Sequence, residues 1–235
     1  MSALRAVTLD AVGTLFAPAE PVGATYGRVA ARHGIALPAA DLDTRFRAAF
    51  ASAPPLAFGN IEPAERVRRE RAWWRALVCE TFGPAGDHPG FDACFGALFA
   101  HYGHADAWRV FPEVAGTLTR LRAHGLRLGV VSNFDGRLPG VLVGLGLARL
   151  LDAILLSTVV GVAKPAGGIF RAAAAALAAP PDDMLHAGDD VQADVAGALA
   201  AGLRAVLVDR AGWRPVLPRG ASAITTLAEI EAFLG

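Results

Sequence analysis

The chain has 235 residues, of which 54% are hydrophobic and 19% charged, so it can bury a substantial core and is not intrinsically disordered. Its 22 basic residues balance its 22 acidic ones, which argues against a nucleic-acid-binding surface, because such surfaces carry a basic excess. No stretch approaches the roughly 20 apolar residues that span a bilayer. Asp10 interrupts the first apolar run, which is unlike a signal peptide. The two cysteines, Cys79 and Cys94, lie in helical patterns, and we expect reduced thiols in a cytoplasmic protein.

A single strand is predicted at the start of the chain, and only helices follow it for about 80 residues. Residues 4–9 are apolar and β-prone, and Gly13-Thr14 ends the pattern just after Asp10. Glycine and proline then punctuate a series of helical patterns. These helices are predicted at 21–32, 39–53, 62–82 and 91–102.

From Pro112 onward, helices and strands alternate. The helices are predicted at 112–124, 138–149, 168–179, 191–201 and 225–234, and the strands at 126–131, 153–156, 184–187 and 205–208. This alternation indicates βαβ units, and short all-apolar strands are typical of a parallel sheet covered on both faces. The sequence therefore predicts an α/β protein with a three-layer, Rossmann-like parallel sheet core at 1–17 and 108–235. An inserted all-helical cap domain is expected at 18–107.

Polar side chains gather at the carboxyl ends of four predicted strands, which is where parallel α/β sheets bind ligands. They are Asp10 and Thr14, with Gly13 between them; Ser132 and Asn133; Lys164; and Asp189, Asp190 and Asp194. A carboxylate that is held in place can act as a nucleophile, and a neighbouring lysine keeps it ionised. Asp10 and Asp189 together would form the oxygen-rich site that Mg²⁺ prefers, with ligands at about 2.1 Å. Such a metal shields an attacking carboxylate from a negative phosphoryl group.

Four segments resemble the motifs of the haloacid dehalogenase-like superfamily, in that family's order and spacing. They are Leu9-Asp10-Ala11-Val12-Gly13-Thr14-Leu15, Val131-Ser132-Asn133, Gly161-Val162-Ala163-Lys164-Pro165 and His186-Ala187-Gly188-Asp189-Asp190 followed by Asp194. The resemblance covers the whole chain, and the helical insertion is similar to the subclass with a helical cap between motifs one and two. The stretch 132–138 and Trp73-Trp74 resemble a branch described only as haloacid dehalogenase-like hydrolases. We expect both tryptophans to serve packing more than substrate binding.

The resemblance implies hydrolysis of a small phosphorylated metabolite. Asp10 would attack the substrate and form a covalent aspartyl intermediate, and Lys164 would steady the nucleophile and the transferring group. Thr14, Ser132 and Asn133 would bind the substrate. The expected partner is accordingly a small, anionic molecule, with no nucleic acid and no membrane. The oligomeric state does not follow from the sequence.

The resemblance also implies a Mg²⁺ cofactor. Asp10, the backbone carbonyl of Val12 and Asp189 would ligate the metal. Asp190 and Asp194 would lie around these ligands and orient them.

Val12 departs from the phosphatase pattern, which has a second aspartate at this position to protonate the leaving oxygen and later activate water. General acid–base catalysis is typically worth about 10²–10⁴ in rate, so esters with alkoxide leaving groups should react slowly and acyl phosphates should suffer less. Three alternatives follow. A metal-independent 2-haloacid dehalogenase would also lack this acid, but Asp189 and Asp190 argue against it. A phosphonate-cleaving enzyme needs a cap lysine, and Lys164 is the only lysine. The chain could also be a catalytically weak binding or regulatory member.

Overall fold

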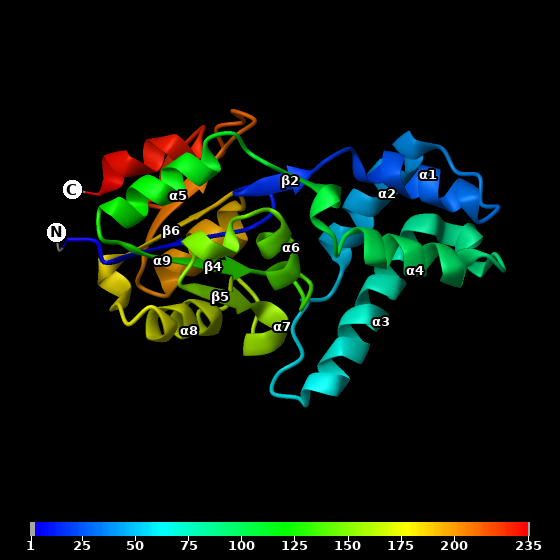
Figure 1. Ribbon diagram of the computed structural model, residues 1–235, viewed down its shortest axis with the longest axis horizontal. Coiled ribbons are helices and arrows are strands. Elements are labelled where there is room, and N and C mark those ends of the chain that lie inside the picture. The colour runs from blue at the N-terminus through cyan, green and yellow to red at the C-terminus, as the bar shows by residue number, and fades with distance from the viewer. Residues whose placement is uncertain (1–2, 235) are drawn as a thin grey trace.

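The computed structural model describes residues 3–234, and Figure 1 shows a sheet with flanking helices beside a separate group of helices. The sheet has six strands in the order β5-β4-β1-β6-β7-β8, and all neighbouring pairs are parallel. They are β1 (Ala6–Leu9), β4 (Arg127–Ser132), β5 (Ala153–Leu156), β6 (Met184–Gly188), β7 (Arg204–Val208) and β8 (Ser222–Ile224). The strands that precede Asp10 and Asp189, β1 and β6, are therefore neighbours in the middle of the sheet.

Side chains alternate between the two faces of the sheet, and each face packs against its own layer of helices. Val7 and Leu9 lie in one hydrophobic cluster with residues of α5, α6 and the C-terminal 3-10 helix. Ala6 and Val131 lie in a second cluster with residues of α8 and α9. These helices are α5 (Val114–Ala123), α6 (Leu138–Gly144), α8 (Gly168–Ala176), α9 (Gly197–Ala200) and the 3-10 helix Leu227–Phe233. The predicted three-layer α/β architecture is confirmed.

Four α-helices between residues 18 and 108 form the second part of the molecule, and we call them the cap helices. They are α1 (Val22–Arg32), α2 (Ala39–Ser52), α3 (Pro63–Phe82) and α4 (Phe91–His101). Pro63 starts the longest of them, and Gly83, with φ of 60°, follows its last residue, as the sequence pattern predicts. The cap helices enclose a hydrophobic cluster of their own, which includes Tyr26, Leu42 and Phe82.

A short antiparallel pair of strands joins the cap helices to the sheet. The chain leaves through β2 (Phe16–Pro18) and returns through β3 (Trp108–Val110), so that both crossings lie side by side. A second contact lies next to the short helix α7 (Ser157–Val160), where the Ser157 hydroxyl donates a hydrogen bond to the carbonyl of Leu56 at 2.6 Å. These connections hold the cap helices against the carboxyl edge of the sheet.

The structure differs from the sequence prediction mainly at element ends. The helix expected at 191–201 begins as a π-helical segment, Val191–Ala196, before α9. The helices expected at 138–149 and 168–179 end early, at Gly144 and Ala176. The short strands β2, β3 and β8 are absent from the prediction because three residues carry too weak a pattern. None of the described helices has the length and hydropathy of a membrane span.

Candidate active site

A pocket lies where the carboxyl ends of β1, β4 and β6 face the cap helices. Its volume is about 390 Å³, within the range of about 300–1,000 Å³ typical of small-molecule sites. Asp10, Ser132, Lys164 and Asp189 line its floor together with Asp194. The structure therefore brings together residues from four loops that are far apart in the sequence, as predicted.

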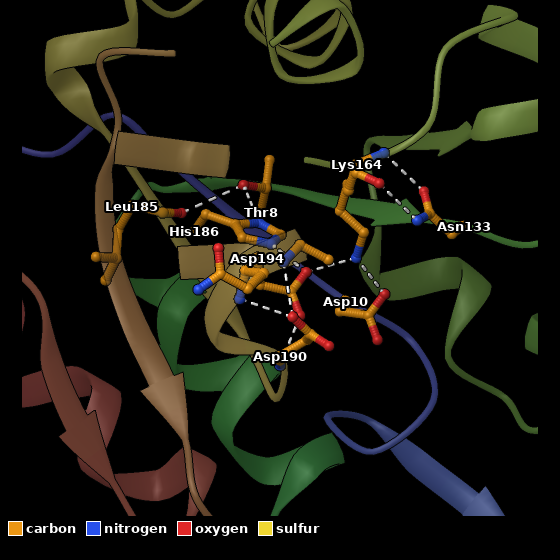
Figure 2. Close-up of polar contacts among 10 residues, drawn as sticks. Thr8, Asp10, Asn133, Lys164, Leu185, His186, Asp190 and Asp194 are labelled. Atoms are coloured by element: carbon orange, nitrogen blue, oxygen red, sulfur yellow. Dashed lines mark hydrogen bonds and ion pairs between the residues drawn. The ribbon is translucent and has the colours of Figure 1, made fainter. Parts of the chain in front are cut away.

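The single lysine of the chain joins two carboxylates at the floor of this pocket. The Nζ of Lys164 lies 2.6 Å from Oδ1 of Asp10 and 2.5 Å from Oδ1 of Asp194, and the side chain is only 3% exposed (Figure 2). Burial by itself would lower the pKa of Lys164, but the two carboxylate charges outweigh it and hold that pKa above its ordinary value. The ammonium is therefore permanently charged, and it anchors Asp10 in one position.

The carboxylate of Asp194 contacts three other groups of the site. Besides Lys164, its Oδ1 faces Nε2 of His186 at 3.0 Å, and its Oδ2 accepts the backbone N–H of Asp190 at 3.0 Å. Burial alone would raise the pKa of Asp194, but Lys164 and His186 hold it below its ordinary value. Since the ionised carboxylate only accepts hydrogen bonds, Nε2 of His186 carries the proton. Asp194 thus lies beside Asp10, and its expected role in orienting metal ligands stays a prediction.

His186 belongs to a hydrogen-bond chain that the sequence did not reveal. It lies on β6 directly opposite Thr8 of β1, and its Nδ1 is 3.0 Å from the Thr8 hydroxyl (Figure 2). Both residues are buried. In the sequence, His186 stood out only as the first residue of the motif that contains Asp189. A threonine and a histidine in otherwise apolar, central strands are the sequence signal for such a contact, because buried polar groups need partners.

The carboxylates of the site outnumber its cations. Oxygens of Asp10, Asp189 and Asp194 lie within 4.8 Å of one another, and among residues 3–234 Asp189 forms no ion pair. Burial and the charges of Asp10 and Asp194 raise the pKa of Asp189 to about 7, and burial also raises that of Asp10. A cluster of hard oxygen donors with excess negative charge is what a divalent cation such as Mg²⁺ would offset, so these residues fit that ion.

Gly13 makes room for Asp189. It has φ of 90°, and a Cβ built on it would lie 2.1 Å from Oδ2 of Asp189. Any other residue would push this carboxylate away from Asp10. The side chain of Arg210 supports the same loop, because it donates hydrogen bonds to the carbonyls of Gly13 and Thr14 at 3.1 and 2.7 Å and pairs with Glu113.

The predicted substrate-binding residues have different surroundings. Ser132 ends β4 and lines the pocket, and its hydroxyl makes no hydrogen bond with the described residues. Asn133 also lines the pocket, but its side-chain amide is engaged with the backbone of Lys164. Thr14 is fully buried with an unpaired hydroxyl and is not among the pocket-lining residues, so its role in substrate binding stays a prediction.

Asp190 and Val12 also lie at the pocket. The Asp190 carboxylate caps the segment that follows it, accepting the backbone N–H groups of Gln192 and Ala193 at 2.7 Å each. One carboxylate oxygen of Asp190 is therefore engaged within its own loop, and Asp190 is not part of the cluster formed by Asp10, Asp189 and Asp194. Val12 lines the pocket beside Asp10 with an apolar side chain that packs against the core. The position that the family's phosphatases use for an acid is therefore apolar here.

Two charged residues near the cap helices were not expected from the sequence. Asp135, fully buried, forms an ion pair with Arg137 at 2.6 Å and accepts the indole N–H of Trp74 at 2.5 Å. The Arg137 guanidinium lies 3.8 Å from the ring centre of Phe99. Trp74, which we expected to serve packing, does pack here, and it also lines the pocket.

Comparison with known proteins agrees with these motifs. The family described as haloacid dehalogenase-like hydrolase matches residues 4–202. Haloacid dehalogenase-like hydrolase domain-containing protein 3 of Homo sapiens is 34% identical over 87% of this chain and 82% of its own. A phosphoserine phosphatase of Thermus thermophilus is 38% identical over 53% of this chain and 50% of its own.

Solved structures share the fold. The 2-haloacid dehalogenase of Pseudomonas syringae superposes with a TM-score of 0.64 at 23% identity, over 98% of both chains. The family match over residues 4–202 and the relative that is 34% identical show that the chain belongs to the haloacid dehalogenase-like hydrolases.

Proposed function

We propose that this hydrolase is a Mg²⁺-dependent phosphatase that cleaves a small phosphorylated metabolite through an aspartyl-phosphate on Asp10. The observation that carries the proposal is the shared ammonium of Lys164, which holds Asp10 beside the unpaired carboxylate of Asp189. An anionic nucleophile repels an anionic phosphoryl group unless cations lie between or beside them. The floor of the pocket supplies one cation, the ammonium of Lys164. The carboxylates of Asp10 and Asp189 could bind a second one, a metal ion.

In the proposed reaction, Asp10 Oδ attacks phosphorus while the bond from phosphorus to the leaving oxygen breaks. The electron pair stays on the leaving oxygen, which takes its proton from solvent because Val12 has none to give. Water then attacks the phosphorus of the aspartyl-phosphate, releases inorganic phosphate and restores Asp10. Lys164 stays protonated throughout and balances the negative charge that moves between Asp10 and the phosphoryl group.

The remaining residues bind and orient. Asp10, Asp189 and the backbone carbonyl of Val12 would hold Mg²⁺, which when bound neutralises phosphoryl oxygens. The free hydroxyl of Ser132 donates a hydrogen bond to one of those oxygens. Asp194 positions Lys164, and His186 positions Asp194. The cap helices, with residues 18–107 as their domain, would exclude water and select the substrate.

A metal-independent 2-haloacid dehalogenase remains a second candidate, because Val12 is apolar and halide leaves without a proton. In that reaction Asp10 would attack carbon and form an ester. The cluster of Asp10, Asp189 and Asp194 favours the phosphatase. Three carboxylates around one ammonium repel one another, and only a reaction that uses a metal cation would offset this repulsion.

A paired assay separates the two candidates. The protein is incubated with acetyl phosphate or with 2-chloropropionate, each in MgCl₂ and in EDTA, and released phosphate or chloride is measured. We expect phosphate release that needs MgCl₂, and a phosphoryl group on the Asp10 peptide after acid quenching, detected by mass spectrometry. Chloride release in EDTA would overturn the proposal.

Two variants complete the assay. Asp10→Asn keeps the shape of the side chain but removes the nucleophile, so phosphate release and the mass change should both vanish. Asp87→Asn changes an exposed carboxylate outside the pocket and should behave as the parent protein. If Asp10→Asn keeps the parent rate, Asp10 is not the nucleophile.

A further inference from the structure

The walls of the pocket are aromatic and its floor is charged. Nine of the 23 residues that line it are aromatic, although aromatic residues make up only 8% of the chain. Most of them come from α1–α4 and from residues 102–108, which lead back to the sheet, and Phe134 comes from the loop after β4. The others include Tyr26, Phe46, Phe50, Trp74, Phe99 and Trp108. Rings packed at 5–6 Å continue from Phe46 to Phe50 and from Trp108 to Phe134.

The walls also carry no uncompensated charge. Arg137 is the one ionised side chain among the lining residues outside the motif loops, and the buried carboxylate of Asp135 neutralises it. Two further hydrogen-bonding atoms of its guanidinium are taken by Asp135 Oδ1 and the carbonyl of Phe99. A charged group would lose its water in this space without gaining an opposite charge, whereas a flat apolar ring would gain contact area. The hydroxyl of Tyr102, buried and without a partner among the described residues, offers the walls a single hydrogen bond, too few for a polyhydroxylated group.

The floor of the pocket also restricts the leaving group of the substrate, and it does so independently of the walls. With Val12 in place of an acid, the leaving oxygen departs as an anion, so its own pKa sets the rate. Phenols ionise near pKa ~10, as the tyrosine side chain does, whereas alkyl alcohols resemble water, at about 15.7. The pocket walls favour an aromatic ring, and the floor favours a leaving oxygen of low basicity. A substrate whose leaving oxygen is attached to an aromatic ring meets both conditions.

We infer that the substrate is an aryl phosphate, that is, a phosphate monoester of an aromatic alcohol whose ring lies between the cap helices. This inference rests on the proposed phosphatase function and narrows it. The ester bond between phosphorus and the phenolic oxygen breaks, the phenolate leaves and takes a proton from water, and the phosphoryl group passes to Asp10 and then to water. The products are a phenol and inorganic phosphate.

The test uses four esters with MgCl₂ and compares their kcat/KM values. Phenyl and 2-naphthyl phosphate have leaving groups of similar pKa, so the ratio of their kcat/KM values measures only the contact of the ring with the pocket walls. We expect 2-naphthyl phosphate to be better by about tenfold or more, as one added apolar group in a fitted pocket is worth. Phenyl and benzyl phosphate have the same ring but different leaving groups, and we expect about 10²-fold between them. Glycerol 3-phosphate should be the poorest.

Two variants assign the effect to the pocket. Phe50 lines it but is 49% exposed, so Phe50→Ala should fold, and the ratio of 2-naphthyl to phenyl phosphate should fall toward one. Trp213 is 85% exposed and lies outside the lining residues, so Trp213→Ala should keep the parent ratio. Competitive inhibition by 2-naphthol, but not by glycerol, checks the same contact in the unmodified protein.

The outcomes are distinguishable. If acetyl phosphate is hydrolysed but glycerol 3-phosphate matches 2-naphthyl phosphate, the aryl inference is wrong and the phosphatase proposal stands. A ratio of 2-naphthyl to phenyl phosphate near one in the parent protein overturns it equally. If neither acetyl phosphate nor any ester is hydrolysed, the proposed function itself fails.

Discussion

The side-chain amide of Asn133 and the backbone of Lys164 form two hydrogen bonds with each other. Nδ2 of Asn133 donates to the Lys164 carbonyl at 3.0 Å, and the Lys164 N–H donates to Oδ1 of Asn133 at 2.8 Å (Figure 2). The amide thereby ties the end of β4 to the loop that carries the lysine. Asn133 is in this respect a positioning residue for Lys164 more than a substrate ligand.

Asn133→Ala should accordingly change turnover more than binding. Without the two hydrogen bonds, the backbone of Lys164 can shift relative to the end of β4 although its ion pairs remain, and a displacement of about 1 Å can cost about 10²-fold in rate. We expect kcat for acetyl phosphate to fall by about that factor while KM stays close to its parent value. The other asparagine, Asn60, is exposed, and Asn60→Ala serves as the control. A raised KM with an unchanged kcat would instead make Asn133 a substrate ligand.

Lys164→Met should destabilise the protein strongly. It keeps much of the length of the side chain but leaves the carboxylates of Asp10 and Asp194 buried without their ammonium, a loss of about 3–5 kcal/mol for a broken buried pair. Thermal unfolding without metal measures it. Arg122→Met removes one partner of an exposed pair with Asp152 and should cost less than about 1 kcal/mol.

The double variant Lys164→Met with Asp194→Asn tests whether the loss comes from unpaired charge. Removing the Asp194 charge should recover part of the stability that Lys164→Met loses. If the two single changes add without any recovery, Lys164 contributes mainly through packing.

Asp189→Asn should make the metal-free protein more stable at high pH. The pKa of Asp189 lies near 3.8 in the unfolded chain and rises to about 7 in the folded one. A raised folded-state pKa adds stability that is complete below pH 4 and is lost as the pH rises through 7. Asparagine avoids this loss. The carboxylate of Asp189 is partly desolvated beside Asp10, but its residue keeps contact with water, which screens the charge. We therefore expect about 1 kcal/mol at pH 8, or about 2–4 °C in Tm.

The same variant tests the metal site by a readout other than activity. MgCl₂ should raise the Tm of the parent protein at pH 8, because a ligand that binds only the folded state stabilises it. Asp189→Asn should lose most of that response, whereas the control Asp87→Asn should keep it. An undiminished response in Asp189→Asn would place the cation elsewhere.

The sequence predicted the sheet core and the floor of the pocket well, for a definable physical reason. Apolar strands of four to six residues separated by helices indicate a parallel sheet, and the carboxyl ends of parallel strands lie at one edge. Asp10, Ser132, Lys164 and Asp189 all follow such strands, so their convergence follows from topology alone. The four cap helices followed equally from helical patterns that glycine and proline punctuate.

The features that the sequence did not predict are contacts between side chains of different helices, strands and loops. The contact of Thr8 with His186 requires the register of β1 against β6, and the contact of Asp135 with Trp74 requires the placement of α3 against the loop after β4. The aromatic walls were hidden for another reason. Aromatic residues on an amphipathic helix pack equally well in a core or along a cavity. The sequence pattern around Trp74 therefore does not distinguish the two placements.

Val12→Asp should restore the missing acid and change the ranking of substrates. Val12 lines the pocket beside Asp10, so we expect a carboxyl group at this position to reach the leaving oxygen. We expect kcat/KM for benzyl phosphate to rise by about 10²-fold, the usual value of a positioned acid, with a much smaller rise for phenyl phosphate. The gap between these two esters should therefore close, and Val12→Asn, which matches the shape without a titratable proton, should leave the gap open.

The same variant decides whether the chain is a catalyst or a weak binding member. If the parent protein hydrolyses phenyl phosphate and Val12→Asp extends this to benzyl phosphate, the parent site is complete for weakly basic leaving groups. Should Val12→Asp fold, bind Mg²⁺ and still hydrolyse neither ester, the absence of an acid is not what limits the site. The regulatory alternative would then be favoured, because a nucleophile, a cation site and an acid in one pocket would have failed to produce turnover.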